Sequence, residues 1–298
     1  MESSNQIGKY AEDTLPEGQD YIHTRNNRRF EAFVEMLTDP EAAPTIGCVT
    51  GKPGSGKTIA IAKDYQSRVR NTTISHLPEI VMTKIPTNAT ASTVAKVILG
   101  ALGENTNIRG NRHDFAEKIV RAISDNGVKL IYVDESDRLN KDSFDIIRYV
   151  HDRTGCTFII VGLPDVLQVI DRYEQFSSRV GLRMTFKPLE LEEVMDVILP
   201  NIVIKGWIYD PGNDDDRKLG TEAWKMSGSF RRLRNLLERA AVKARKDNVK
   251  IDLDLLKAAF EHTASSEEKR RKSKKNYSSG NLESESERRN DAKAGKDK

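Results

Sequence analysis

The chain has 298 residues, 37% of them hydrophobic and 31% charged, and its formal net charge is +3. This length can bury a sizeable core in one large or two smaller domains. No apolar run approaches the roughly 20 residues of a transmembrane helix, and the N-terminal stretch lacks the apolar middle of a secretory signal. A cytoplasmic protein without a membrane partner is therefore expected. Cys48 and Cys156 lack metal-binding or disulfide spacing, so reduced thiols in or beside buried strands are expected.

Apolar, β-branched stretches alternate with amphipathic helices over the first two thirds of the chain. Buried strands are expected at 45–51, 79–85, 128–135 and 156–162, with a last strand-like segment at 183–189. Helices are expected around them, at 26–37, 57–70, 91–102, 114–125 and 141–154. Continuous apolar strands that alternate with helices indicate a parallel sheet covered on both faces.

After residue 189 the pattern changes to helices alone, at 190–204, 217–226, 229–246 and 252–263. This predicts an α/β unit over 22–188 and an all-helical unit over 189–264. Residues 1–21 are expected to be flexible, and residues 265–298 to be a disordered basic tail. The tail holds 11 basic and 7 acidic residues, which leaves 37 basic against 38 acidic in the remainder. Nucleic-acid affinity of the folded part would therefore need a local patch.

The segment from Gly51 to Thr58 reads G-x-x-x-x-G-K-T after a β-branched strand and before a helix. Its glycines allow successive backbone N–H groups to point at phosphate oxygens, and the helix adds its positive end. Lys57 is expected to reach the β and γ phosphates of ATP, and the Thr58 hydroxyl to bind Mg²⁺. The expected nucleotide-binding residues of this loop are Gly51, Pro53, Gly54, Ser55, Gly56, Lys57 and Thr58.

Two acidic residues, Asp134 and Glu135, end the apolar strand "LIYVDE". In a P-loop protein the first acid is suited to hold Mg²⁺ through a bound water. The second is suited to orient and deprotonate an attacking water, which favours hydrolysis of ATP over its use by a small-molecule kinase.

Three arginines are candidates for contact with the nucleotide. Arg179, with Arg183 as second choice, precedes the last strand-like segment and could reach the γ-phosphate of a neighbouring subunit. Arg231 opens a helix of the second unit and could touch the nucleotide from there. A surface ion pair is the competing role for each of them.

The order of P-loop, Asp-Glu pair, Ser-Arg before the last strand and Gly-x-x-Arg in a helical unit is that of AAA+ ATPases. Within that class, "VDESDRLNKDSFDIIRYVHDRTGCTFIIVGLPDVLQVI" resembles transposition regulators of the TnsC, TniB, MuB and IstB family, closest to the short TnsC and TniB type. The resemblance covers about residues 22–264. It implies an AAA+ P-loop NTPase with a parallel sheet flanked by helices and a small all-helical lid.

The same resemblance implies a homo-oligomer, as a ring or helical filament, that forms on double-stranded DNA when ATP is bound. Its further partners would be a transposase and a target-selection protein. One residue departs from the AAA+ pattern, because Leu163 stands where these proteins usually have a polar sensor. A slow, regulatory ATPase is therefore expected.

DNA contacts in TnsC-like proteins come from the helix and loop after the second strand and fall mainly on phosphates. The residues that this segment offers are Thr93, Lys96, Arg109, Asn111 and Arg112. A solvated surface loop is the alternative interpretation.

Two other functions stay open. A replication initiator or loader of the ORC type shares the class, although such proteins usually carry a winged-helix domain after the lid, and residues 265–298 are short and polar for one. A nucleotide-gated signalling switch would not bind DNA. ATP-dependent retention on plain duplex DNA separates the switch from the other two.

Overall fold

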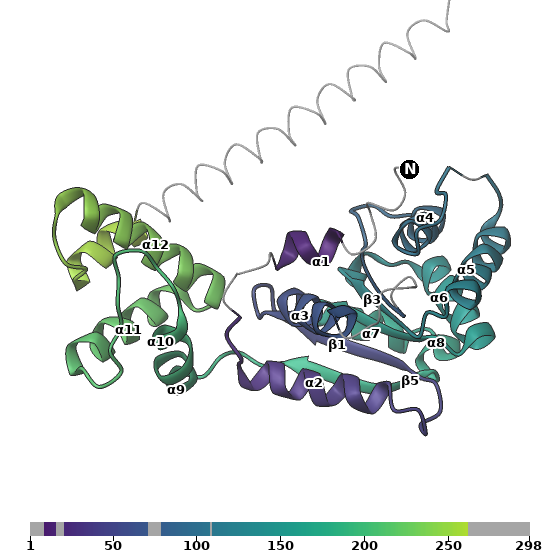
Figure 1. The fold of residues 1–298 in the computed structure, drawn as a ribbon, viewed down its shortest axis with the longest axis horizontal. Coiled ribbons are helices and arrows are strands. Elements are labelled where there is room, and N and C mark those ends of the chain that lie inside the picture. The colour runs from purple at the N-terminus through teal and green to yellow at the C-terminus, as the bar shows by residue number, and fades with distance from the viewer. Residues whose placement is uncertain (1–8, 16–20, 71–78, 108, 262–298) are drawn as a thin grey trace, which may run out of the picture. The chain divides into compact units, whose positions relative to one another are not determined.

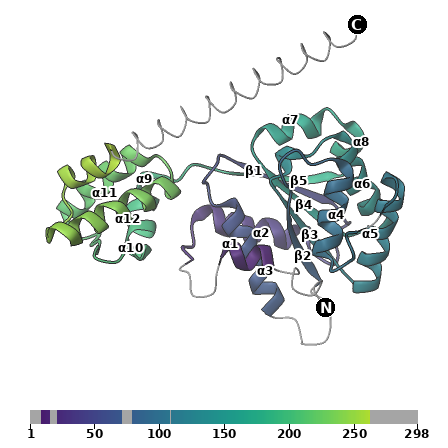
Figure 2. The same ribbon diagram turned by 90° about the horizontal axis from the view of Figure 1, so that it is seen from above.

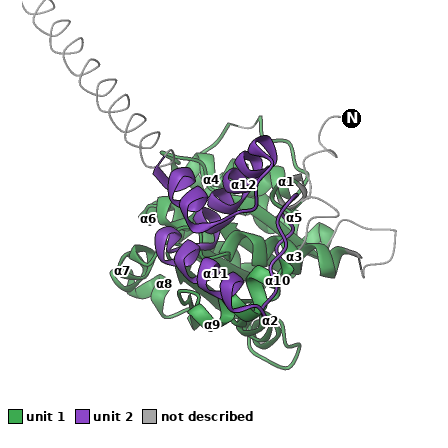
Figure 3. Cartoon of the chain, turned by 90° about the vertical axis from the view of Figure 1, so that its left-hand side faces the viewer, with its two compact units in different colours: residues 1–201 green, residues 202–298 purple. Residues whose placement is uncertain are grey.

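The computed structural model describes residues 9–15, 21–70, 79–107 and 109–261. The chain divides into two compact units, with the boundary between Asn201 and Ile202 (Figure 3). The predicted basic tail, 265–298, lies outside the described residues, as do residues 1–8 and 16–20 of the predicted flexible N-terminus. No helix in the described ranges has the length and apolar character that crossing a membrane would require.

Unit 1 is built on a five-stranded sheet in the order β2-β3-β4-β1-β5 (Figure 1). The strands are β1 (Ile46–Gly51), β2 (Ile80–Lys84), β3 (Leu130–Asp134), β4 (Thr157–Gly162) and β5 (Val180–Phe186). Every pairing is parallel, and β1, β3 and β4 are buried along their whole length. The predicted parallel sheet is confirmed. The strand β5 begins at Val180, earlier than predicted. The sequence did not reveal this start because the first half of β5 alternates partly buried and exposed residues instead of forming an apolar run.

Helices cover both faces of this sheet (Figures 1 and 2). One face carries α1 (Lys9–Thr14), α2 (Arg25–Leu37) and α3 (Lys57–Arg70). The other carries α4 (Ala91–Ala101), α5 (Arg112–Asn126), α6 (Lys141–Thr154), α7 (Asp165–Asp171) and α8 (Glu174–Ser177). Each face has its own cluster of buried apolar side chains. The sequence did not predict α1, α7 or α8, because helices of 6, 7 and 4 residues are too short for a clear period.

Both cysteines lie inside unit 1. Cys48 and Cys156 are free and buried, as expected. Burial raises the pKa of the Cys48 thiol to about 12, so the group stays protonated and acts as a small apolar side chain.

Helix α3 and strand β3 are joined by a buried polar contact. The Tyr132 hydroxyl donates to Asp64 Oδ2 at 2.5 Å, and Arg68 Nε lies 2.8 Å from the same carboxylate oxygen. On the outer side, the Phe30 ring of α2 packs 6.3 Å from the Tyr132 ring, centroid to centroid. Because Tyr132 and Asp134 are two residues apart on one strand, they share this face of the sheet. The contact therefore fixes the helix after the P-loop against the strand that carries the first acid.

A continuous helical segment closes unit 1. It consists of α9 (Leu191–Glu193), the π-helical η3 (Val194–Ile198) and α10 (Leu199–Asn201). The sequence assigned these residues to the lid, and that assignment stays a prediction. The Arg25 amide, at the start of α2, donates to Glu193 Oε1 at 2.5 Å, and the Arg25 guanidinium lies 2.7 Å from Glu190. These two contacts connect the beginning of the segment to α2.

Unit 2 contains α11 (Asp214–Ser227), α12 (Phe230–Asp247) and a last helix over 253–261. Leu233, Leu236, Leu237 and Ala240 form the buried face of α12, at the spacing expected for an amphipathic helix. Gly228, in a left-handed conformation with φ 64°, ends α11. An antiparallel bridge between Ile204 and Trp207 precedes these helices. Unit 2 is thus helical, as predicted, apart from this bridge.

We predict that Tyr132→Phe lowers the free energy of unfolding by about 1–3 kcal/mol, because the buried Asp64 carboxylate loses a donor. Urea unfolding measures the change. Tyr149→Phe is the matched control, since the Tyr149 hydroxyl donates to Glu117 at the surface and its loss should cost less. Equal losses in the two variants would contradict a special role for the Tyr132 contact.

Candidate active site

The carboxyl ends of the parallel strands meet at one edge of the sheet, which is where open α/β sheets bind ligands. Gly51 ends β1, Lys84 ends β2, Asp134 ends β3 and Gly162 ends β4. The P-loop and the Asp-Glu pair, which are far apart in the sequence, are therefore brought to the same edge.

The loop from Gly51 to Lys57 has the backbone that its glycines allow. Gly54 and Gly56 have φ values of 76° and 95°, in the region that glycine tolerates best. A Cβ on Gly51 would lie 2.8 Å from Phe186 Cβ, so a side chain there would push the loop away from β5. Pro53 is exposed in the turn, which the Ser55 amide closes onto Lys52 O at 3.2 Å.

The interior of this loop suits an anion. Lys57 is only 8% exposed, and its amino group donates to the carbonyl oxygens of Gly51 at 2.7 Å and Lys52 at 3.2 Å. The Ser55 hydroxyl is buried without a hydrogen-bond partner among the described residues. Helix α3 starts at Lys57 with no acidic residue in its first turn, so its positive end is not neutralised there. A buried ammonium, an unsatisfied hydroxyl and a helix N-terminus together fit a phosphate group.

Thr58 and Asp134 offer the hydroxyl and carboxylate oxygens that Mg²⁺ prefers. Thr58 is partly buried on α3, next to Lys57. No cluster of three or more His, Cys, Asp or Glu side chains suited to a metal exists within the described part of the chain. A metal at this edge would therefore need further oxygens from water or from phosphate.

Asp134 is 3% exposed and has a donor on each carboxylate oxygen. The Tyr10 hydroxyl donates to Oδ2 at 2.8 Å, and the Glu135 amide donates to Oδ1 at 2.8 Å. These bonds offset part of the free-energy cost of burying the charge. Burial, and after it the nearby Asp134 carboxylate, raises the pKa of Tyr10 well above its usual range, so the phenol remains a donor. The sequence did not predict Tyr10, because a single tyrosine in a polar segment carries no periodic signal.

Glu135 adopts a left-handed backbone conformation, with φ 58° and ψ 36°. Its carboxylate lies between two cations, 3.6 Å from Lys84 Nζ and 3.1 Å from Arg138 Nη2. Left-handed residues other than glycine cost about 1–3 kcal/mol and often occur at functional sites. The strained backbone and the two cations together fix the direction of this carboxylate.

The six residues "DESDRL", from Asp134 to Leu139, connect the ends of three strands. Within this turn the Arg138 guanidinium donates to Ile85 O, just after β2, at 2.7 Å. Ser136 Oγ donates to Val133 O on β3 at 2.6 Å. Asp137 Oδ1 accepts from the Leu163 amide, just after β4, at 3.2 Å. As noted from the sequence, position 163 has no polar side chain. The carboxylate of Asp137 lies against the backbone amide of Leu163.

Arg179 and Arg183 are both held in ion pairs inside unit 1. Arg179 Nε lies 2.6 Å from Asp152 Oδ1, and Arg183 Nη2 lies 2.7 Å from Asp171 Oδ1. The hydrogen bond from Arg179 holds the pKa of Asp152 below its usual value. The structure therefore records the surface ion pair for both arginines, and action on a neighbouring subunit stays a prediction that requires these pairs to open.

Arg231 is exposed in the first turn of α12, in unit 2. Its contact with the nucleotide also stays a prediction.

The five predicted DNA-binding residues are not equivalent. Thr93 and Lys96 are partly buried on α4, with Thr93 Oγ 3.0 Å from the N-cap Thr90 Oγ. Arg109 is exposed just before α5 and has no ion-pair partner within the described ranges.

Asn111 and Arg112 already have structural roles. The Asn111 side-chain oxygen caps α5 by accepting from the amides of His113 at 2.8 Å and Asp114 at 3.1 Å. Arg112 forms an ion pair with Asp142 at the start of α6. A capping sequence explains the choice of Asn at 111 without DNA, which the sequence interpretation missed.

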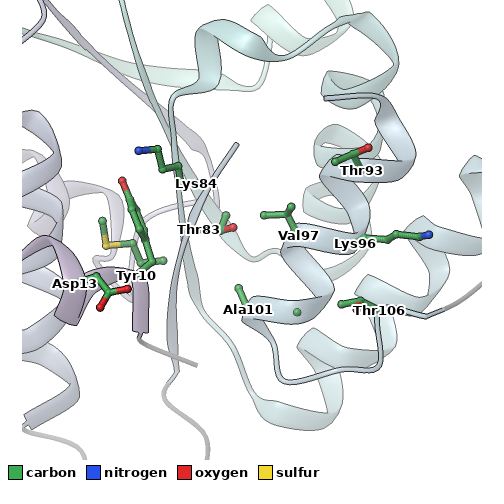
Figure 4. A pocket seen from close by; sticks show the side chains of 11 residues that line it. Tyr10, Asp13, Thr83, Lys84, Thr93, Lys96, Val97, Ala101 and Thr106 are labelled. Carbon is green, nitrogen blue, oxygen red and sulfur yellow. The ribbon is translucent and has the colours of Figure 1, made fainter. Parts of the chain in front are cut away.

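A cavity of about 550 Å³ lies between α1, β2 and α4. Figure 4 shows Tyr10 beside Lys84 on one side, with the Lys96 side chain pointing away from both. The two amino groups therefore do not converge on a common ligand. The lining residues are Tyr10, Asp13, Met82, Thr83, Lys84, Thr93, Lys96, Val97, Gly100, Ala101 and Thr106.

We predict a pH-dependent effect of Arg179→Gln on stability. Because the folded pKa of Asp152 is below its ordinary value of about 3.8, the ion pair stabilises the fold above that pH and ceases to do so as pH falls through the lowered value. The pair is about one-third exposed, so the loss near pH 7 should be at most about 1 kcal/mol. Urea unfolding between pH 2 and 7 tests this, and an offset that stays the same at all pH values would contradict it.

Comparison with known proteins agrees with this geometry. Residues 41–170 match the family model described as AAA domain. The chain is 24% identical over 209 residues to a Staphylococcus aureus protein described as a potential ATP-binding protein, and the match covers 62% of this chain and 73% of that protein.

The fold is also similar to that of several solved structures. The chain is similar to the ORC1 protein of Aeropyrum pernix in complex with DNA, with a TM-score of 0.60, 19% identity, and coverage of 85% of this chain and 69% of that one. It is also similar to Cdc6p of Pyrobaculum aerophilum, with a TM-score of 0.62 and 15% identity; the match covers 80% of this chain and 68% of that one. For domain III of the Thermotoga maritima DnaA protein the TM-score is 0.55 and the identity 15%; the match covers 85% of this chain and 96% of that one. Unit 1 therefore has the fold of an AAA+ P-loop NTPase, and residues 41–170 are similar to the AAA domain family.

Proposed function

We propose that this chain is an ATPase that binds double-stranded DNA as an ATP-dependent homo-oligomer and regulates transposition by bringing a transposase to its target. The observation that carries the proposal is the meeting of a P-loop with a buried Lys57 and the Asp134–Glu135 pair at one edge of the sheet. The "DESDRL" turn, whose side chains connect β2, β3 and β4, supports the narrower assignment to a TnsC-like regulator.

In this proposal Lys57 and the N-terminus of α3 hold the phosphates of ATP. Thr58 and Asp134 hold Mg²⁺, which neutralises charge on the phosphate oxygens. Glu135 orients the attacking water and accepts its proton. Leu163 supplies no polar group at the end of β4, so we propose slow turnover that times the release of DNA.

The arginines act only after assembly. A neighbouring subunit's γ-phosphate would take Arg179 from Asp152, with Arg183 as the second candidate. Both pairs are about one-third or more exposed, so exchanging one partner for another costs little free energy. Arg231 approaches the nucleotide from unit 2.

DNA binding is supported by the fold's likeness to an ORC1 protein that was solved in complex with DNA. We propose that Thr93, Lys96 and Arg109 contact phosphates, with the capping Asn111 and the paired Arg112 in minor roles. Phosphate contacts carry no base information, so binding should not depend on sequence.

A second function, that of a replication initiator or loader, is supported by the likeness to ORC1, Cdc6p and DnaA structures. The two functions differ in sequence preference. Competition among unrelated duplexes distinguishes them, because a target-selecting regulator should bind all alike, whereas an initiator should prefer its own sites. A signalling switch would bind none of them.

We predict that Lys57→Ala abolishes ATP-dependent assembly on duplex DNA, because the phosphates lose their main counter-charge. Glu135→Gln is the matched variant: it should assemble, since only the proton acceptor is lost, and its DNA complexes should live longer. Electron microscopy and a DNA retention assay, with ATP and with a non-hydrolysable analogue, measure both. DNA-bound oligomers of Lys57→Ala in ATP would refute nucleotide-gated assembly.

We predict that Arg109→Ala weakens DNA binding about equally on unrelated sequences. Its log–log salt slope should fall by roughly one unit for each phosphate that the variant no longer binds. Arg112→Ala, a charge-matched change three residues away, should have a smaller effect because Asp142 already pairs with that guanidinium. Fluorescence anisotropy over a salt series measures the slopes. A larger effect of Arg112→Ala would reverse the two assignments.

A further inference from the structure

Helix α1 joins the N-terminal segment to the candidate active site. Leu15, at its end, is 4% exposed, and its carbonyl oxygen accepts from Gln66 Nε2 of α3 at 2.5 Å. Thr14 Oγ donates to Tyr10 O at 2.7 Å within the helix. One end of α1 is thus attached to the helix that follows the P-loop, while Tyr10 reaches Asp134 at the other.

Tyr10 is also linked to the second acid. Lys84 Nζ lies 5.6 Å from the centroid of the Tyr10 ring and 3.6 Å from Glu135 Oε1. The Tyr10 hydroxyl therefore contacts the Asp134 carboxylate, and the Tyr10 ring contacts Lys84, the cation that pairs with Glu135. Figure 4 shows the Tyr10 and Lys84 side chains next to each other.

The two donors on Asp134 have different origins. The Glu135 amide belongs to the same turn, whereas Tyr10 is 124 residues away in sequence. With one donor on each oxygen, rotation of the carboxylate about its own axis is restricted. A carboxylate has about four lone-pair positions, so two remain for a metal-bound water and a hydroxyl such as that of Thr58. Tyr10 can thus orient the group without excluding a metal.

We propose that Tyr10 is a positioning residue for Asp134, and that through it α1 sets the Mg²⁺ dependence of nucleotide binding. The inference rests on the proposed function, because Asp134 is given there the role of holding Mg²⁺. Hydrogen-bond partners behind a metal-holding group typically change metal affinity by about 10–100-fold when they are removed.

The test uses the full chain with Tyr10→Phe, which keeps the ring against Lys84 and removes only the hydroxyl. The dissociation constant of a fluorescent ATP analogue is measured in Mg²⁺ and in EDTA. We expect binding in Mg²⁺ to weaken about 10-fold or more, and binding in EDTA to be unchanged, which also serves as the check on folding. Tyr149→Phe, on the opposite face of the sheet, should change neither value.

A second variant reaches the same carboxylate by another route. Gln66→Ala removes the contact that holds the end of α1, and should give a smaller loss of affinity with the same Mg²⁺ selectivity. In nucleotide-free protein, amide hydrogen exchange of residues 9–15 should be faster in both variants than in the wild type.

The outcomes separate the inference from the function on which it rests. If the wild type binds no nucleotide, the proposed function fails. If the wild type binds with Mg²⁺ dependence and Tyr10→Phe keeps the same dependence, the positioning role is overturned. Tighter binding of Tyr10→Phe in Mg²⁺ would also overturn it, since Tyr10 would then block the site.

Discussion

The buried carboxylate of Asp134 is the constraint on which the candidate site depends. A charge that is 3% exposed must be hydrogen-bonded, and its two donors come from a strained turn beside it and from a helix 124 residues earlier in the sequence. Behind it, Tyr132 and Asp64 join β3 to α3. The P-loop helix, the strand of the acids and α1 are therefore connected through two tyrosine–aspartate hydrogen bonds on one face of the sheet.

Several ionic groups in unit 1 are paired within the single chain. Arg179, Arg183 and Arg112 each contact an aspartate, and Lys84 and Arg138 contact Glu135. Most of these pairs are at least one-third exposed, and such pairs contribute at most about 1 kcal/mol each. Charges that are held this weakly are neutralised in the isolated chain, yet they can change partners when a phosphate or another subunit arrives.

Local patterns in the sequence predicted the sheet, the long helices, the P-loop and the two acids, because each depends on residues close together in the chain. Helix α3 has the predicted bounds, Lys57–Arg70. What local patterns could not predict are contacts between distant segments, such as Tyr10 with Asp134, or Arg25 with Glu193. The capping role of Asn111 was missed for a different reason: a capping asparagine and a DNA-binding asparagine look alike until the helix start is known. Its contact with DNA stays a prediction.

The left-handed backbone at Glu135 has a consequence for how this turn can vary. Glycine adopts φ 58° with little strain, so a glycine there would relax the turn and add to the stability of the fold. The same change would remove the carboxylate that Lys84 and Arg138 hold. Stability and the proposed chemistry thus favour different residues at one position, and drift toward a more stable turn would leave a protein that folds well and retains its P-loop but lacks the carboxylate that the proposed hydrolysis requires.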